Sequence, residues 1–181
     1  AVSLRSANIT VMMAAARKAG RALIRDFNEV EHLQVSLKGP ANFVSAADKR
    51  AEDIIFSELS KARPGFGFVL EERGEVKGSD GQHQVIVDPL DGTTNFLHSI
   101  PLFAISIGLV KDGIPVAGII FNPVTDELYA AERGQGAYLN SRRLRVAARK
   151  NLGDAVISCG IPHHERGDHE RFRRELGVLQ K

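Results

Sequence analysis

The chain has 181 residues, of which 43% are hydrophobic and 25% are charged, and this composition predicts a globular protein with one substantial core or two small ones. The formal net charge of +2 is too small to indicate nucleic-acid binding, so we expect no direct nucleic-acid partner. No apolar run approaches the ~20 residues of a membrane span, and the first residues lack the features of a signal peptide. We therefore expect a cytoplasmic protein without a membrane partner.

The cysteine and histidine content argues against transition-metal chemistry. Cys159 is the only cysteine, which excludes an intrachain disulfide and a multi-cysteine zinc or iron–sulfur site. We expect this thiol to be buried and unreactive. The pattern of His163, His164 and His169 favours exposed loop histidines over a metal site.

Two helices are expected before the main run of strands. From Ile9 to Phe27, apolar or small residues recur at steps of three and four, which is typical of a helix that packs on a sheet. Residues 34–44 contain a Gly-Pro pair and little helical period, so we expect a loop with one short strand there. A second helix should begin at Ser45, which has the spacing of a capping box with Asp48, and should end at Pro64.

From residue 66 the hydrophobic period shifts from about 3.6 to about 2, which indicates strands. The expected strands are 66–70, 84–88, 102–110, 114–122, 127–131, 136–139 and 143–146. Asp112-Gly113 and Asn140-Ser141 are each placed as a two-residue hairpin turn, which predicts antiparallel pairing. A last helix is expected from Glu165 to Lys181. This order of elements predicts an α+β layered fold, with two N-terminal helices packed on a mainly antiparallel sheet.

Acidic residues follow two of the apolar strands. Pro89, which has no N–H, is expected to end one strand and to hold Asp88 and Asp91 on one tight turn. The Leu90 carbonyl between them, and Glu71 at the end of another strand, add hard oxygen donors that suit Mg²⁺ or Mn²⁺ better than zinc. A bound cation would also offset the repulsion among these carboxylates.

The residues that follow the second aspartate are expected to begin a helix. The N–H groups of Gly92, Thr93 and Thr94 would then face a phosphate at the positive end of that helix. Asp-Pro and Asp-Gly pairs are also common turn signals, and a Thr-Thr pair is often a helix cap. The length of the stretch DPLDGTTNF, with Glu71 and Glu72 upstream, favours a functional site over turn chemistry.

A resemblance to a known family is carried by four stretches: KGPANFVSAADKRAE at 38–52, LEERGE at 70–75, VIVDPLDGTTNFLHSIPLFAISIGL at 85–109 and RGQGAYLNSRRLRV at 133–146. The chain resembles the inositol monophosphatase family of Mg²⁺-dependent phosphatases, specifically its bacterial branch of extragenic-suppressor proteins. The resemblance implies a sugar-phosphatase-like fold. It also implies a phosphomonoesterase that hydrolyses inositol monophosphate, or a similar small polyol or sugar phosphate, with a metal-activated water.

The resemblance implies a metal role for four residues. Glu71 and the Leu90 carbonyl would bind a first Mg²⁺ or Mn²⁺, and Asp88 would bridge two ions. Asp91 would bind the second ion and face the substrate. Two or three ions would occupy the site of the complete protein.

The resemblance also implies the catalytic and substrate contacts. Thr93 and Asp48 would orient and deprotonate the attacking water, although the capping-box spacing also allows a purely structural Asp48. Glu72 would contact the metal-bound waters. The implied catalytic residues are Asp48, Glu71 and Thr93, and the implied substrate-binding residues are Glu71, Leu90, Asp91, Gly92 and Thr93.

One departure from the family pattern affects the expected domains. The family continues with a Trp-Asp motif, and this chain contains no tryptophan. We therefore expect a chain truncated before that motif, which would hold the first metal better than the second. Residues 1–150 would form the metal- and phosphate-binding domain, and residues 151–181 would begin a C-terminal α/β portion that is largely missing.

Several alternatives stay open at this point. Histidinol phosphate, fructose bisphosphate and nucleotide 3′-phosphates are other substrates of similar enzymes. A second function, as an accessory protein of a transcription complex, would depend on surface residues. Five basic residues that are otherwise typical of a solvated hairpin rim would then form the contact: Arg142, Arg143, Arg145, Arg149 and Lys150. A homodimer is also expected, with the apolar strands over 102–122 as one source of its interface.

Overall fold

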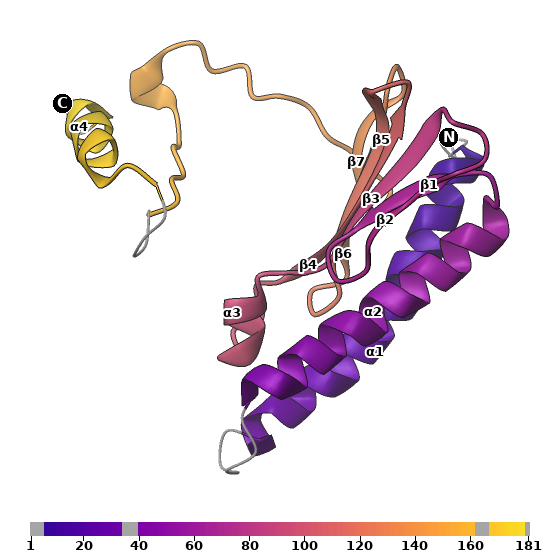
Figure 1. The fold of residues 1–181 in the computed structure, drawn as a ribbon. Helices are drawn as coiled ribbons and strands as arrows, with labels where there is room; N and C mark the ends of the chain where they lie inside the picture. The colour runs from indigo at the N-terminus through magenta and orange to yellow at the C-terminus, as the bar shows by residue number, and fades with distance from the viewer. Residues whose placement is uncertain (1–5, 34–39, 162–166, 180–181) are drawn as a thin grey trace. The chain divides into compact units, whose positions relative to one another are not determined.

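Figure 1 shows the fold as a computed structural model, which describes residues 6–33, 40–161 and 167–179. The chain divides into two compact units, Ala1–Arg145 and Val146–Lys181. The division therefore falls at Arg145, whereas the expected domain boundary was at residue 150. The loop expected over 34–39, together with His163 and His164, lies outside the described residues.

The two N-terminal helices are α1 (Ala7–Leu33) and α2 (Pro40–Ala62). They lie side by side against one face of the sheet (Figure 1). Ile9, Ala16 and Leu23 of α1 are buried, as the apolar spacing predicted. The first helix is thus confirmed, and it extends beyond its predicted end because the apolar face continues to Val30, which is also buried.

Helix α2 begins at Pro40, so the predicted start at Ser45 and the loop predicted over 40–44 are wrong. A helix accepts proline in its first turn, because the N–H that proline lacks would have no partner there. Asp48 therefore lies inside the helix, and the capping role that its spacing with Ser45 suggested is excluded. The buried stripe of α2 consists of Ala47, Ala51, Ile55 and Leu59.

The strands form one eight-stranded sheet in the order β2-β1-β3-β4-β5-β6-β7-β8. Their bounds are β1 Gly67–Leu70, β2 Gly74–Val76, β3 His83–Asp91, β4 Ala104–Lys111, β5 Ile114–Asn122, β6 Glu127–Glu132, β7 Gly136–Leu139 and β8 Arg142–Arg143. Strand β1 runs parallel to β3, and the other neighbouring pairs of this sheet are antiparallel. The predicted α+β fold, with two helices on a mainly antiparallel sheet, is confirmed.

Three strands differ from the prediction. Strand β2 was not expected, because Gly74–Val76 has no apolar alternation and is defined by its pairing with β1. Strand β3 continues through Pro89 to Asp91, so the prediction that Pro89 ends the strand is wrong. The register of β3 shifts between Asp88 and Asp91, and an irregularity of this kind accommodates a residue without an N–H. Strand β8 includes only the start of the stretch expected over 143–146.

Both predicted hairpin turns are present. The φ angle is 51° at Asp112 and 76° at Gly113, so both residues adopt the left-handed conformation of a type I′ turn. Strands β4 and β5 pair directly across it. Asn140 has a φ of 52° in the second turn, which joins β7 to β8.

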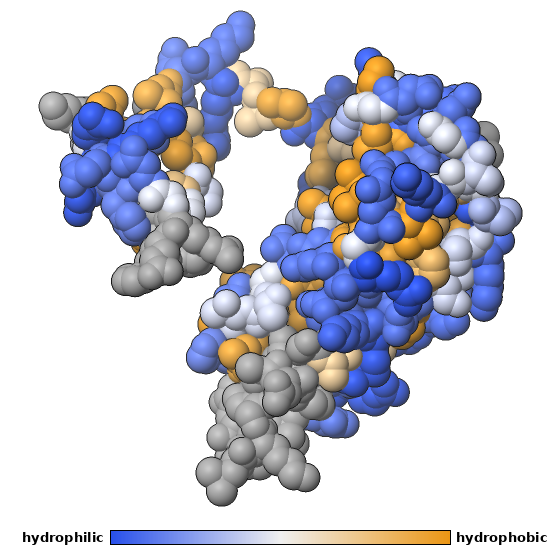
Figure 2. All heavy atoms as spheres, in the orientation of Figure 1, coloured by the Kyte–Doolittle hydropathy of each residue, from blue (hydrophilic) through white to orange (hydrophobic). Residues whose placement is uncertain are grey.

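The hydrophobic core lies between the helices and the face of the sheet that they cover. Ile105, Ile107 and Leu109 alternate along β4 and are buried there. On the opposite face of the sheet, the side chains of Ile86 and Ile120 are 45% and 51% exposed. Figure 2 shows hydrophobic residues gathered over the strands on the visible side of this unit.

The second unit contains η1 (Leu152–Asp154) and α4 (His169–Leu179). The predicted last helix is confirmed over His169–Leu179, but it begins later than expected, because the described residues Gly167 and Asp168 are not helical. Cys159 is exposed, so the expectation of a buried thiol is wrong. Residues 155–161 form no helix or strand in the described structure, and their side chains are exposed. No helix among the described residues is both long and apolar enough to cross a membrane.

Candidate functional site

The parallel pairing of β1 with β3 brings two of the predicted site residues together. Leu70 pairs with Val87 at the carboxyl ends of these strands, so Glu71 and Asp88 follow at the same edge of the sheet. Glu71 begins the turn that leads into β2. Glu71 and Asp88 share a side-chain hydrogen bond, which shows that their carboxyl groups meet.

Helix α2 supplies a third carboxyl group. Asp48 is only 5% exposed, and its Oδ1 atom is buried with no hydrogen-bond partner among the described residues. A buried carboxylate oxygen without a partner is unfavourable, because it has lost its hydration. Asp48 is thus held in a position that folding alone does not favour.

Burial and the nearby negative charges raise the pKa of all three carboxyl groups. Burial, followed by the charges of the neighbouring acids, raises the pKa of Asp48 from its ordinary 3.8 to about 7. Burial and then the charge of Asp88 raise the pKa of Glu71 above its usual range. Burial is also the main cause that raises the pKa of Asp88. The acids whose charges act on Asp48 are Glu71, Glu72, Asp88 and Glu52.

Asp91 and Leu90 lie at the end of β3. The charge of Asp91 acts on Asp88, and the Leu90 N–H donates to Oδ1 of Asp88 at 3.1 Å. The Leu90 carbonyl accepts a hydrogen bond from the Thr93 hydroxyl at 3.1 Å. The Thr93 hydroxyl therefore contacts Leu90 and makes no hydrogen bond to the buried Oδ1 atom of Asp48.

The predicted helix start is confirmed as α3 (Thr93–Leu97), which follows Gly92. Gly92 has a φ of 96°, and a Cβ atom there would lie 3.0 Å from the Leu102 carbonyl oxygen. Only glycine fits this position without strain. The Asn95 side chain donates to the same carbonyl at 2.6 Å and fixes the short helix against the segment before β4.

The donor atoms fit a hard cation by their chemistry. Glu71, Asp88 and Asp91 offer carboxylate oxygens and Leu90 a carbonyl oxygen, which Mg²⁺ and Mn²⁺ bind in preference to nitrogen or sulfur. Within the described ranges, no three His, Cys, Asp or Glu side chains converge closely enough to hold an ion. The raised pKa values and the unpartnered buried oxygen of Asp48 both show that the negative charge here is not balanced by the protein, and a bound cation would balance it.

Glu52 is a residue of this region that the sequence did not reveal. It is 2% exposed, and its Oε2 atom accepts the backbone N–H of Glu72 at 2.7 Å. The sequence did contain one indication of this residue. Asp48 and Glu52 are four residues apart, so two acids interrupt the apolar face of one helix. Lys49 contacts the Glu72 carboxylate at 3.7 Å.

These observations define a site of clustered carboxyl groups beside a glycine-led helix start. The sequence model of the inositol monophosphatase family matches residues 5–178. The chain therefore belongs to this family, and the resemblance seen in the sequence is confirmed.

Similar proteins from other bacteria agree with this membership. The chain is 66% identical over 172 residues to the inositol-1-monophosphatase of Mesorhizobium japonicum, a match that covers 95% of this chain and 65% of that protein. It is 41% identical over 160 residues to the Nus factor SuhB of Xylella fastidiosa, covering 87% of this chain and 57% of that protein. The chain thus spans about two thirds or less of the length of these relatives.

A solved structure has the same fold. The crystal structure of the extragenic suppressor protein suhB from Bartonella henselae matches with a TM-score of 0.86 and 59% sequence identity. The match covers 97% of this chain and 67% of that one. The fold described above is therefore the fold of this part of a family member.

Proposed function

We propose that this protein is a divalent-cation-dependent phosphomonoesterase that acts on inositol monophosphate or a similar small polyol or sugar phosphate. The observation that carries the proposal is the clustering of charge at the carboxyl ends of β1 and β3, where Glu71 and Asp88 lie beside the start of α3 and act on the buried Asp48 of α2. Family membership and the name of the Mesorhizobium relative support the same activity.

Four residues would hold the cation, with Mg²⁺ favoured and Mn²⁺ as an alternative. Glu71 and the Leu90 carbonyl are proposed as ligands of a first ion, Asp88 as a ligand shared by two ions, and Asp91 as a ligand of the second. When bound, such ions supply a water with a lowered pKa and positive charge beside the leaving oxygen. The complete protein is proposed to hold two or three ions.

The phosphate group would bind at the start of α3. The backbone N–H groups of Gly92 and Thr93 have no partner within the helix, because the first N–H groups of a helix lack acceptors. They are proposed to donate to the phosphate oxygens. Asp91, which directly precedes them, is proposed to face the polyol.

Asp48 would accept the proton of the attacking water. A pKa of about 7 suits a general base near neutral pH, because the group is then partly deprotonated and still basic. Thr93 is proposed to orient the same water, and its hydroxyl would turn from the Leu90 carbonyl to do so. Glu72 is proposed to contact the waters around the cation.

The test is phosphate release from inositol 1-phosphate as a function of Mg²⁺ concentration. We expect release that requires Mg²⁺ and falls by more than ~100-fold in Asp88→Asn, as loss of a metal ligand implies. The Mesorhizobium relative serves as the positive control. Histidinol phosphate, fructose bisphosphate and a nucleotide 3′-phosphate test the alternative substrates. Release from none of these esters, with the relative active, would reject the proposal.

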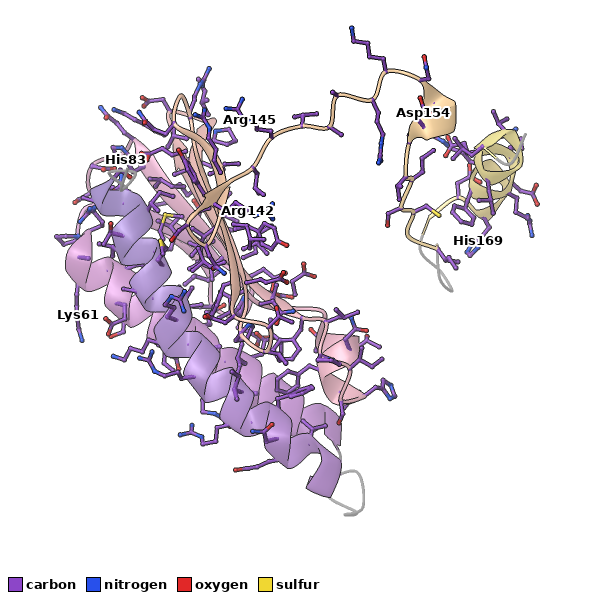
Figure 3. All side chains as sticks on the ribbon, turned by 180° about the vertical axis from the view of Figure 1, so that it is seen from behind. Lys61, His83, Arg142, Arg145, Asp154 and His169 are labelled. Carbon is purple, nitrogen blue, oxygen red and sulfur yellow. The ribbon has the colours of Figure 1, made fainter. Side chains whose placement is uncertain are left out.

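A second candidate function is an accessory role in a transcription complex. It is supported by the name of the Xylella relative, a Nus factor, and by exposed basic residues around the end of the sheet, two of which Figure 3 labels as Arg142 and Arg145. Two sets of substitutions should distinguish the two functions. Asp88→Asn should abolish phosphatase activity and leave this role intact, whereas Arg142→Ala combined with Arg145→Ala should do the reverse.

We also propose a homodimer that uses the open face of the sheet. The exposed apolar side chains of Ile120 and Tyr129 on β5 and β6 support it. Sedimentation of the protein and of Ile120→Asp tests it, since a charge at the interface should give a monomer. The cytoplasmic location stays a prediction.

A further inference from the structure

Glu52 is a buried carboxylate that the proposed reaction does not use. It lies inside α2, one turn beyond Asp48, with a side chain that is 2% exposed. Burial of a carboxylate is unfavourable unless hydrogen bonds replace its hydration. The partner that the structure gives it is the main-chain N–H of Glu72, at 2.7 Å from Oε2. The Glu52 carboxylate thus binds a backbone N–H group. This hydrogen bond does not involve the side chain of any proposed cation ligand.

The backbone N–H that Glu52 binds belongs to the turn between β1 and β2, which also carries the proposed cation ligand Glu71. Residues 71–73 connect β1 to β2, and Glu71 is the first of them. Two exposed ion pairs also join this turn to α2: Arg73 with Asp53, and Glu72 with Lys49. Exposed ion pairs contribute little, whereas a buried hydrogen bond to a charged acceptor contributes more. The bond from Glu52 is therefore the main polar tie between the turn and the helix.

We propose that Glu52 is a positioning residue for the cation site, which fixes the β1–β2 turn so that the Glu71 carboxylate stays beside Asp88. This inference rests on the proposed function, because it assigns Glu71 to a cation. The charge of Glu52 also acts on both Asp48 and Glu71, so the carboxylate lies near the whole group. One helix thereby supplies both a proposed base, Asp48, and the support for a proposed ligand.

The position of Glu71 is otherwise weakly fixed. Glu71, Glu72 and Arg73 are exposed, and strand β2 after them is short and lies at the edge of the sheet. Removal of the bond would leave the turn free to move relative to Asp88, which sits on β3 between two neighbouring strands. A purely structural Glu52 would lower stability without changing the cation affinity of the folded protein. A positioning residue changes that affinity.

The experiment is calorimetric titration of the 181-residue chain with Mn²⁺, at a temperature where each variant is folded. We expect Glu52→Ala to weaken Mn²⁺ binding by about 10-fold or more, as supporting residues of metal sites do. Glu52→Gln keeps an oxygen that can accept the Glu72 N–H and should bind within about threefold of the unmodified chain. Asp26→Asn is the matched control: Asp26 is also buried, joins α1 to Arg50 of α2 at 2.8 Å, and should leave the affinity unchanged.

Hydrogen exchange at the Glu72 amide gives a second readout that needs no cation. We expect protection in the unmodified chain and in Glu52→Gln, and fast exchange in Glu52→Ala. If Glu52→Ala does not fold, Glu52→Asp withdraws the carboxylate by one methylene and should weaken binding in the same direction.

The outcomes separate the two proposals. Mn²⁺ binding that Asp88→Asn abolishes and Glu52→Ala leaves unchanged would overturn the role of Glu52 alone. Absence of Mn²⁺ binding in the unmodified chain would overturn the cation site, and the role of Glu52 with it. Equal weakening in Glu52→Ala and Asp26→Asn would show a general effect of buried carboxylates and would also overturn the inference.

Discussion

Asp48 is a side chain whose position is unfavourable for folding, and we propose a chemical role for it. Its Oδ1 atom is buried without a described partner, and burial together with the charges of neighbouring acids raises its pKa to about 7. Its spacing with Ser45 suggested a helix cap, and the family resemblance implied a base; the start of α2 at Pro40 excludes the cap. A residue kept at an energetic disadvantage inside a helix is the kind of residue that function retains.

The raised pKa of Asp48 predicts the pH dependence of stability in the cation-free chain. Between pH 3.8 and about 7 the folded chain binds the Asp48 proton more tightly than the unfolded chain does. The free energy of unfolding should therefore fall as the pH rises through this range. Asp48→Asn should be more stable than the unmodified chain at pH 8 by roughly 1–3 kcal/mol, and equally stable near pH 4.

Urea unfolding in the presence of a chelator measures this difference. Glu58→Gln, also on α2, is the control. The Lys18 side chain holds the pKa of Glu58 below its ordinary value, so the loss of Glu58 should not stabilise the chain at pH 8. A variant Asp48→Asn that is less stable than the unmodified chain at pH 8 would contradict the electrostatic account.

Gly92 carries both backbone strain and a close contact. Gly92→Ala would place a Cβ atom 3.0 Å from the Leu102 carbonyl oxygen at a φ of 96°. Gly74 has a φ of 81° and open space around it, so Gly74→Ala isolates the conformational part. We expect Gly74→Ala to lower the free energy of unfolding by about 1 kcal/mol and Gly92→Ala by about 2–4 kcal/mol. Equal losses in urea unfolding would show that the contact with Leu102 relaxes.

At the scale of elements, periodicity predicted most of the fold, and pairing determined the rest. Strands β3 to β7 carry apolar runs or turn signals that can be seen locally. Strand β2 has neither and exists because β1 offers it an edge. The start of α2 was misplaced by five residues because a Gly-Pro pair usually indicates a loop, yet proline also suits the first turn of a helix.

The packing of α1 on the sheet depends on one small residue. A Cβ atom at Gly20 would lie 2.7 Å from Cε1 of Phe121 and 3.0 Å from Cβ of Pro123. Gly20→Ala should therefore lower the free energy of unfolding by about 1–2 kcal/mol, although alanine is the better helix former by up to about 1 kcal/mol. Gly177→Ala in α4, where nothing lies within 4 Å, should increase the protection of α4 amides. Stabilisation by Gly20→Ala in urea unfolding would contradict the close packing.

At the scale of the whole molecule, the site depends on contacts that no local pattern contains. The sequence alone groups one part of the site, because its residues are close neighbours along the chain: Asp88, Leu90, Asp91 and Gly92. The approach of Glu71 requires the parallel pairing of β1 with β3, and the approach of Asp48 requires α2 to pack on that pair. Glu71 was a candidate ligand from its place after an apolar strand, and the family resemblance implied a catalytic Asp48, whereas periodicity and spacing could not predict that the two lie near Asp88.

The same clustering predicts how a cation affects the whole chain. Like charges brought together by folding oppose it, so a cation that binds only the folded chain should stabilise it. At a Mg²⁺ concentration about 100 times its dissociation constant, the free energy of unfolding should rise by about 2.7 kcal/mol, or roughly 5–10 °C in melting temperature for a chain of this size. Asp88→Asn should melt at the same temperature with Mg²⁺ and with a chelator. Calorimetric melting at pH 7.5 measures both, and Na⁺ at equal ionic strength is the control for screening. An equal rise in the variant would mean that Mg²⁺ acts on the general charge of the surface and not at the site of Glu71 and Asp88.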